Sequence, residues 1–176
     1  ILDTFDSGFS QPEGVAVDAS GNIYVADTFH HAIKKMDAAG NNLVTLGSGF
    51  FRPSGVAVSN GNIYVADTAN NAIKKMDADG NNLVTLGSGF SGPYDVAVDA
   101  SGYIYVADSG NDAVKRMDAD GNNIITLGSG FKGPSGVAAD DANGNIYVAD
   151  FENNAVKKIQ SIYGVAYDGN GNTGGG

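Results

Sequence analysis

The segment GVAVDASGNIYVAD at residues 14–27 decides the fold, because close copies of it return along the chain. Its last four letters, YVAD, occur at 24–27, 64–67, 105–108 and 147–150. The prolines recur at spacings of 41, 40 and 41 residues, as Pro12, Pro53, Pro93 and Pro134. A period of this length is typical of four-stranded all-β repeat units. The sequence therefore predicts an all-β protein built from tandem units.

Within one unit, short runs of apolar and β-branched residues predict four strands, which we name A to D. In the first unit they are GVAVD at 14–18, NIYVAD at 22–27, AIKKMD at 32–37 and LVTLG at 43–47. The turn Asp-Ala-Ser-Gly between strands A and B suits a type I turn followed by a left-handed glycine. Short antiparallel strands repeated at a fixed period predict a β-propeller of four four-stranded blades.

The propeller is expected to occupy residues 1–168. Its predicted blades cover about 14–47, 55–87, 96–128 and 137–160. The last blade lacks a strand D, while the opening ILDTFDSGF aligns with LVTLGSGF and predicts a lone strand D at residues 1–5. We expect that strand to complete the last blade, either within one chain or between two chains, because an open strand edge invites pairing. The Gly- and Asn-rich tail at 169–176 is predicted to be flexible.

Composition restricts the partners of the chain. The 20 acidic and 10 basic residues give a net charge of −10, which disfavours nucleic acid because its binding depends on neutralising phosphates. No apolar run is long enough to span a membrane, so no membrane contact is expected. Without cysteine, thiolate chemistry is unavailable. The sequence leaves the location open and slightly favours an extracellular one.

The stretch DTANNAIKKMDADGNN at 67–82, followed by LGSGFSGP and VAVDASG, resembles the NHL repeat. That family's pattern is approximately D-T-x-N-x-x-I-x-x-x-D-x-x-G, then a glycine-rich strand end, a proline and a V-A-V-D strand. About four copies cover nearly the whole chain. The resemblance implies a β-propeller, in a family that includes some RNA-binding propellers with a basic face and metal-dependent lyases.

His30 and His31 are the only histidines, and they stand side by side after Asp27. A zinc site would need two further donors from other loops. The sister loops carry Asn-Asn or Asn-Asp at the same two positions. We therefore interpret the histidines as a loop substitution whose polar side chains bond the local backbone. The resemblance keeps a metal-dependent NHL-like lyase using His30 and His31 as an alternative.

Other charged residues recur in every unit, which indicates structural roles. Asp27, Asp67, Asp108 and Asp150 are expected to accept backbone N–H bonds in the loop that follows each. The DADGNN turns resemble a calcium loop only loosely, and weak calcium binding stays open. Eight of the ten basic residues lie in strand C, and their charges are expected to reach water. No catalytic residue, metal site or cofactor is predicted.

The loops between strands B and C and between strands D and A differ most from one unit to the next. In a propeller both emerge at the same end of the ring. The predicted contact residues on that end are Phe29, His30, His31, Phe51, Arg52, Tyr94, Lys132, Phe151 and Glu152. Aromatic residues interleaved with charges are typical of protein contacts. We expect a non-enzymatic scaffold or protein-binding module; the alternatives are a self-assembling subunit joined by strand exchange and the lyase.

Overall fold

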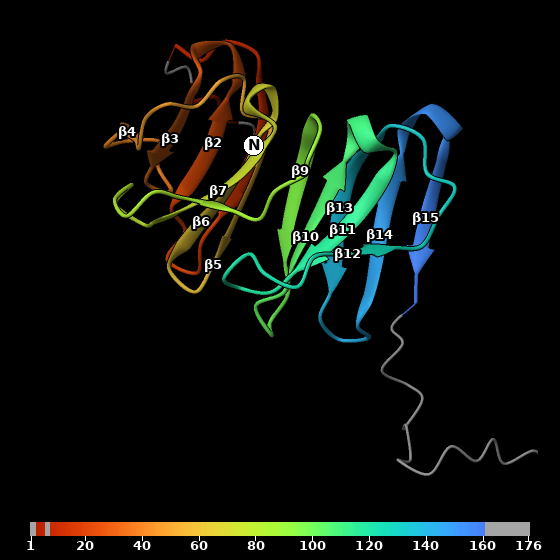
Figure 1. Ribbon diagram of the computed structural model, residues 1–176. Coiled ribbons are helices and arrows are strands. Elements are labelled where there is room, and N and C mark those ends of the chain that lie inside the picture. The colour runs from red at the N-terminus through yellow and green to blue at the C-terminus, as the bar shows by residue number, and fades with distance from the viewer. Residues whose placement is uncertain (1–2, 6–7, 161–176) are drawn as a thin grey trace, which may run out of the picture.

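The structure, a computed structural model, describes residues 3–5 and 8–160. Figure 1 shows four antiparallel sheets arranged one after another, with the first and last at opposite ends. Blade 1 contains β1 (Pro12–Val17), β2 (Ile23–Asp27), β3 (Ala32–Met36) and β4 (Val44–Leu46). Blade 2 contains β5 (Gly55–Ser59), β6 (Asn62–Asp67), β7 (Ala72–Asp77) and β8 (Val84–Leu86). The all-β propeller of four blades is confirmed.

Blades 3 and 4 repeat the same antiparallel order. Blade 3 contains β9 (Pro93–Val98), β10 (Ile104–Asp108), β11 (Ala113–Met117) and β12 (Ile125–Leu127). Blade 4 contains β13 (Pro134–Asp140), β14 (Asn145–Asp150) and β15 (Ala155–Ile159). A single 3-10 turn joins the second and third strands of each blade, at Thr28–His30, Thr68–Asn70, Ser109–Asn111 and Phe151–Asn153. No helix in the described part is long and apolar enough to cross a bilayer.

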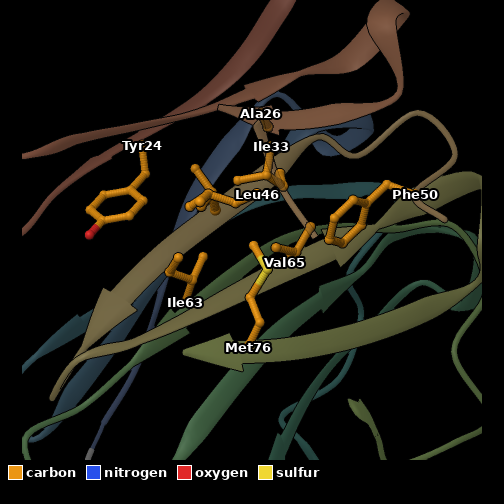
Figure 2. Packing of buried hydrophobic residues seen from close by; sticks show 9 residues of the cluster. Tyr24, Ala26, Ile33, Leu46, Phe50, Ile63, Val65 and Met76 are labelled. Atoms are coloured by element: carbon orange, nitrogen blue, oxygen red, sulfur yellow. The ribbon is translucent and has the colours of Figure 1, made fainter. Parts of the chain in front are cut away.

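The core lies between neighbouring blades. In the first interface, Tyr24, Ala26, Ile33, Leu46 and Phe50 of blade 1 pack against Val56, Ile63, Val65 and Met76 of blade 2, as Figure 2 shows for most of them. Equivalent residues fill the next two interfaces. Side chains alternate across each strand, so one face of a blade meets the preceding blade and the other meets the following one.

The ends of the chain bear on how the propeller closes. Within the described residues the sheet of blade 4 has three strands, β13, β14 and β15. Residues 3–5 form no strand there, and the Phe5 ring lies against Gly40 of blade 1. Completion of the last blade by the N-terminal strand therefore stays a prediction. The tail at 169–176 lies outside the described residues.

Candidate functional site

The two variable segments of a blade lie side by side at one end of it. The backbone N–H of Phe29, in the turn of blade 1, donates to the carbonyl of Ser10, in the linker before β1, at 3.1 Å. Blade 2 repeats this bond from Ala69 to Phe51, also at 3.1 Å. The same pairing holds in the other two blades. We call the surface formed by these turns and linkers the loop face.

A buried aspartate supports the loop face in every blade. The carboxylate of Asp27, which is fully buried, accepts the N–H of Ser10 at 2.7 Å and the ammonium of Lys34 at 2.6 Å. Burial raises the pKa of Asp27, but the hydrogen bonds from Lys34, Ser10 and His30 outweigh it and hold the pKa below its usual range. The sequence predicts that each aspartate accepts a backbone N–H of the loop that follows it. That prediction is wrong, because the N–H group belongs to the linker that precedes the blade.

In blades 2 to 4 the first lysine of the basic pair contacts three groups of the protein, and in blade 1 Lys34 contacts two, Asp27 and the Phe9 ring. The ammonium of Lys74 lies 2.6 Å from Asp67 Oδ2, donates to the carbonyl of Gly49 at 2.8 Å and sits 5.1 Å from the centre of the Phe50 ring. Lys115 and Lys157 make the same set of contacts. The expectation that these charges lie in water is therefore wrong for the first lysine of every pair, because each repeated aspartate takes that lysine as its counter-ion.

The two histidines take the places of asparagines. His30 Nδ1 lies 2.8 Å from Asp27 Oδ2, and the Asn70 amide makes the same contact with Asp67 at 2.8 Å. His31 Nδ1 accepts the N–H of Arg52 at 3.0 Å. The side chains of Asn71 and Asp112 accept the equivalent N–H groups of Gly92 and Gly133 at 2.7 and 2.8 Å. This geometry supports the loop-substitution interpretation.

The left-handed backbone at these positions explains why asparagine recurs there. His31, Asn71, Asp112 and Asn154 have φ of 55°, 52°, 52° and 52°. Asn, Asp and His are the residues other than glycine that visit this region most readily. Across residues 3–5 and 8–160, no group of three or more His, Cys, Asp or Glu side chains is placed to hold a metal ion.

Four of the predicted contact residues form one patch across the boundary between blades 1 and 2. The guanidinium of Arg52 lies 4.6 Å from the centre of the Phe29 ring, and the rings of His31 and Phe51 are 4.8 Å apart. Phe29 and Phe51 are 41% and 48% exposed. We call Phe29, His31, Phe51 and Arg52 the aromatic patch. The side chain of His30 instead turns to Asp27.

The remaining predicted residues lie on other blades. Lys132 and Glu152 of blade 4 form an exposed ion pair at 3.5 Å, beside Phe151, which is 72% exposed. Tyr94 lies at the start of β9, where burial and a hydrogen bond with Glu13 raise its pKa. The structure thus places the predicted contact residues in separate groups, and their role in binding a partner stays a prediction.

A hollow of about 300 Å³ at the first strands of the blades, β1, β5, β9 and β13, was missed by sequence reasoning. Its wall includes the residue that follows the repeated proline in each blade, namely Glu13, Ser54, Tyr94 and Ser135. Asp95 also lines it, at a position that is glycine in the three other blades. The Asp95 carboxylate accepts the N–H groups of Val96 and Val137 at 2.9 and 3.0 Å. Two carboxylates make the hollow suitable for neutral or cationic groups.

The missed residues did leave a signal in the sequence. The residue after each proline is Glu, Ser, Tyr or Ser, although the proline before it and the valine two residues after it are the same in every unit. Asp95 is the one departure from glycine at its position in the four units. Burial raises the pKa of Asp95, and the two N–H bonds offset only part of that effect.

Comparison with known proteins agrees with this architecture. A model of the NHL repeat matches residues 9–36, 50–76 and 131–159, and no curated protein sequence matches the chain. A crystal structure of a nidogen/laminin complex aligns with a TM-score of 0.80 at 24% identity, covering 88% of this chain and 61% of that chain. A streptogramin B lyase structure aligns with a TM-score of 0.73 at 20% identity, covering 91% and 54%.

These likenesses establish the fold. The chain spans less than two thirds of the length of either structural neighbour. The three matched stretches each run from a linker through the third strand of a blade, and they contain the buried aspartate and lysine described above. The chain is therefore a β-propeller in which three of the four blades match the NHL repeat.

Proposed function

We propose that the chain is a non-catalytic scaffold or protein-binding module that holds a protein partner on its loop face. The observation that carries the proposal is the aromatic patch. Its four side chains come from segments that differ between blades, and they contact one another across a blade boundary. Sequence variation is thus concentrated on an exposed surface, while the frame below it repeats.

The physical properties of the patch suit protein recognition. Aromatic residues and arginine dominate the binding energy of many protein interfaces. The contacts of Arg52 with the Phe29 ring and of His31 with the Phe51 ring restrain these side chains before a partner arrives, which lowers the entropy lost on binding. The buried Asp–Lys pairs below keep the loops in place.

The lyase alternative has weaker support. The Nδ1 atoms of His30 and His31 are engaged with Asp27 and with the N–H of Arg52, as the asparagines of sister loops are. The nidogen/laminin neighbour is a complex between proteins, which favours protein binding as a use of this fold. An acidic chain is also a poor ligand for RNA.

The proposal is tested by quantitative affinity capture with three baits. They are the wild-type chain, the patch variant F29S/F51S/R52S and the control variant V84S/I125S, whose exposed residues lie on the outer strands β8 and β12. A protein that wild type and the control capture but the patch variant does not is then purified. The Kd of its complex with each bait is measured.

We expect the patch variant to weaken binding at least about tenfold, equal to about 1.4 kcal/mol, and the control to leave Kd within about twofold. Thermal melts establish that all three baits are folded. A partner that binds all three baits equally would refute the assignment to the loop face, as would a capture in which no protein distinguishes wild type from the patch variant.

A further inference from the structure

Each blade has two apolar faces with different residues. We call the face that meets the preceding blade the leading face; in blade 2 it carries Val56, Ile63, Val65 and Met76. We call the other the trailing face; in blade 1 it carries Tyr24, Ala26, Ile33, Leu46 and Phe50. All three internal interfaces join a trailing face to a leading face. A propeller of this kind is thus held together by one repeated contact.

The leading face of blade 1 is covered only in part: Val25 and Met36 are 7% and 4% exposed, but the valines of β1 are exposed. Val15 is 68% exposed, whereas the equivalent Val56, Val96 and Val137 are 7%, 3% and 7% exposed. Val17, two residues further along the same face, is 60% exposed. A hollow of about 380 Å³ lies beside Val15 and is lined also by Phe5, Phe9 and Val25. Blade 1 therefore presents half of an interface.

The trailing face of blade 4 presents the other half. Val156 is 78% exposed, whereas the equivalent Ile33, Ile73 and Val114 are 0% exposed. Tyr147 is 39% exposed, and its counterparts Tyr24, Tyr64 and Tyr105 are 0%, 4% and 7% exposed. In Figure 1 this blade lies at the opposite end from blade 1. The two exposed faces are of the two kinds that pack together inside the chain.

Residues 3–5 lie against blade 1 in the place that the fourth strand of one blade takes against the next blade. A Cβ on Gly40 would overlap the ring of Phe5, and a Cβ on Gly80 would likewise come within 3.0 Å of Leu46, a residue of β4. Phe5 thus contacts Gly40 of blade 1 at the position where Leu46 contacts Gly80 of blade 2. Blade 4 has no fourth strand among the described residues, so the segment and the edge of β15 complement each other.

The register of this missing pairing follows from blade 1. There β3 pairs with β4 so that Ile33 opposes Leu46 and Lys35 opposes Val44. The alignment of the N-terminal segment with β4 places Phe5 opposite Val156 and Asp3 opposite Lys158. The other fourth strands carry Val44, Val84 and Ile125 where this segment carries Asp3. An acidic residue opposite a basic one favours this pairing.

We propose that a second copy of the chain docks head to tail, with the trailing face of its blade 4 on the leading face of blade 1. The contact repeats the three internal interfaces, and residues 3–5 of one copy pair with β15 of the other. Two copies that make the contact twice form a closed ring. This surface is separate from the loop face, so the inference stands independently of the proposed function.

The test is the solution mass of the full chain and of two single variants, V15R and V156R, measured by light scattering after size exclusion. We expect wild type to show at least twice the 17.9 kDa of one chain. Each variant alone keeps one intact face and should be a monomer. Mixed at equal amounts, the variants should form a complex of two chains and nothing larger, because only one productive contact remains.

Both substitutions alter residues that are exposed in the single chain, so folding should be preserved, and V17R is a second variant of the same leading face. The matched control is V84R, on the outer strand of an internal blade, which should keep the wild-type mass. A monomeric wild type would overturn the proposal. If V15R then melts at a lower temperature than the monomeric wild type, the two end faces meet within one chain. Dimers of V15R alone or V156R alone would equally refute a head-to-tail contact.

Discussion

His31 stands at a backbone position that its sister blades fill with Asn71, Asp112 and Asn154. Replacing it by asparagine should leave the free energy of unfolding unchanged or slightly raised, because Asn also accepts the N–H of Arg52 and tolerates positive φ. Alanine supplies no acceptor and is strained there, so His31→Ala should cost about 1–2 kcal/mol. Urea unfolding measures both. Equal stabilities of the two variants would contradict this role for the imidazole.

Asp95 is a charged residue at a position where the other blades have glycine. Burial raises the pKa of Asp95, so the carboxyl ionises at lower pH in the unfolded chain than in the folded one. Ionisation of Asp95 therefore lowers stability as the pH rises through the unfolded and then the folded pKa. Asp95→Asn should consequently unfold at higher urea than wild type at pH 7.

The gain from Asp95→Asn should vanish at a pH low enough to protonate the carboxyl in both states. The matched control is Glu13→Gln, which removes a more exposed carboxylate from the same hollow. A gain that persists at low pH would show that packing, rather than the charge of Asp95, sets the difference.

At the scale of the strands, the pairing of Lys74 with Asp67 joins neighbouring strands β7 and β6 inside the blade. Removing the lysine leaves a fully buried carboxylate with hydrogen bonds from Phe51 and Asn70 but without a counter-ion. Lys74→Met should therefore cost about 3 kcal/mol, at the lower end of the range for a broken buried pair. The measurement is the free energy of unfolding in urea at pH 7.

The neighbouring lysine provides the control for that experiment. Lys75 lies 5.7 Å from the centre of the Tyr64 ring, and Lys75→Met should cost less than about 1 kcal/mol. The double variant D67N/K74M should recover part of the loss, because no unpaired charge remains buried. If Lys74→Met and Lys75→Met cost the same, the buried pair does not carry the stability assigned to it.

The strands themselves could be predicted because apolar alternation, turn residues and the repeat all indicate the same boundaries. Even so, strand D is shorter than its pattern, since β4 covers only Val44–Leu46. The interpretation of the histidines was reachable by comparing sister loops. The contacts of Lys74 and the hollow around Asp95 could not be predicted in this way, because they join residues from separate strands or blades.

The exposure of the end faces also could not be predicted. Val15 and Val156 occupy the same pattern positions as buried residues in the other blades. Whether such a valine is buried depends on whether a neighbouring blade covers it, and a repeat pattern contains no such information.

At the scale of the whole molecule, equivalent aspartates in several blades each contribute to the free energy of unfolding, and each contribution is lost in acid. Asp37, Asp77 and Asp118 each accept the N–H of an asparagine four residues ahead, which is the main cause that holds the pKa of each below its ordinary value of 3.8. For Asp27 and Asp150, burial raises the pKa, but bonds from their lysines and other donors outweigh that effect and lower it. A lowered folded pKa gives stability that is complete above the unfolded pKa.

That stability should be lost as the pH falls through the lower folded pKa values. Apart from the opposite contribution of Asp95, we therefore expect the urea midpoint to be nearly constant above about pH 5 and to decline steadily below about pH 4. The variant Asp77→Asn should be less stable than wild type at pH 7, and the difference should shrink as the pH falls, because wild type loses the same carboxylate by protonation. A midpoint that stays constant down to about pH 3 would contradict the contribution of these aspartates.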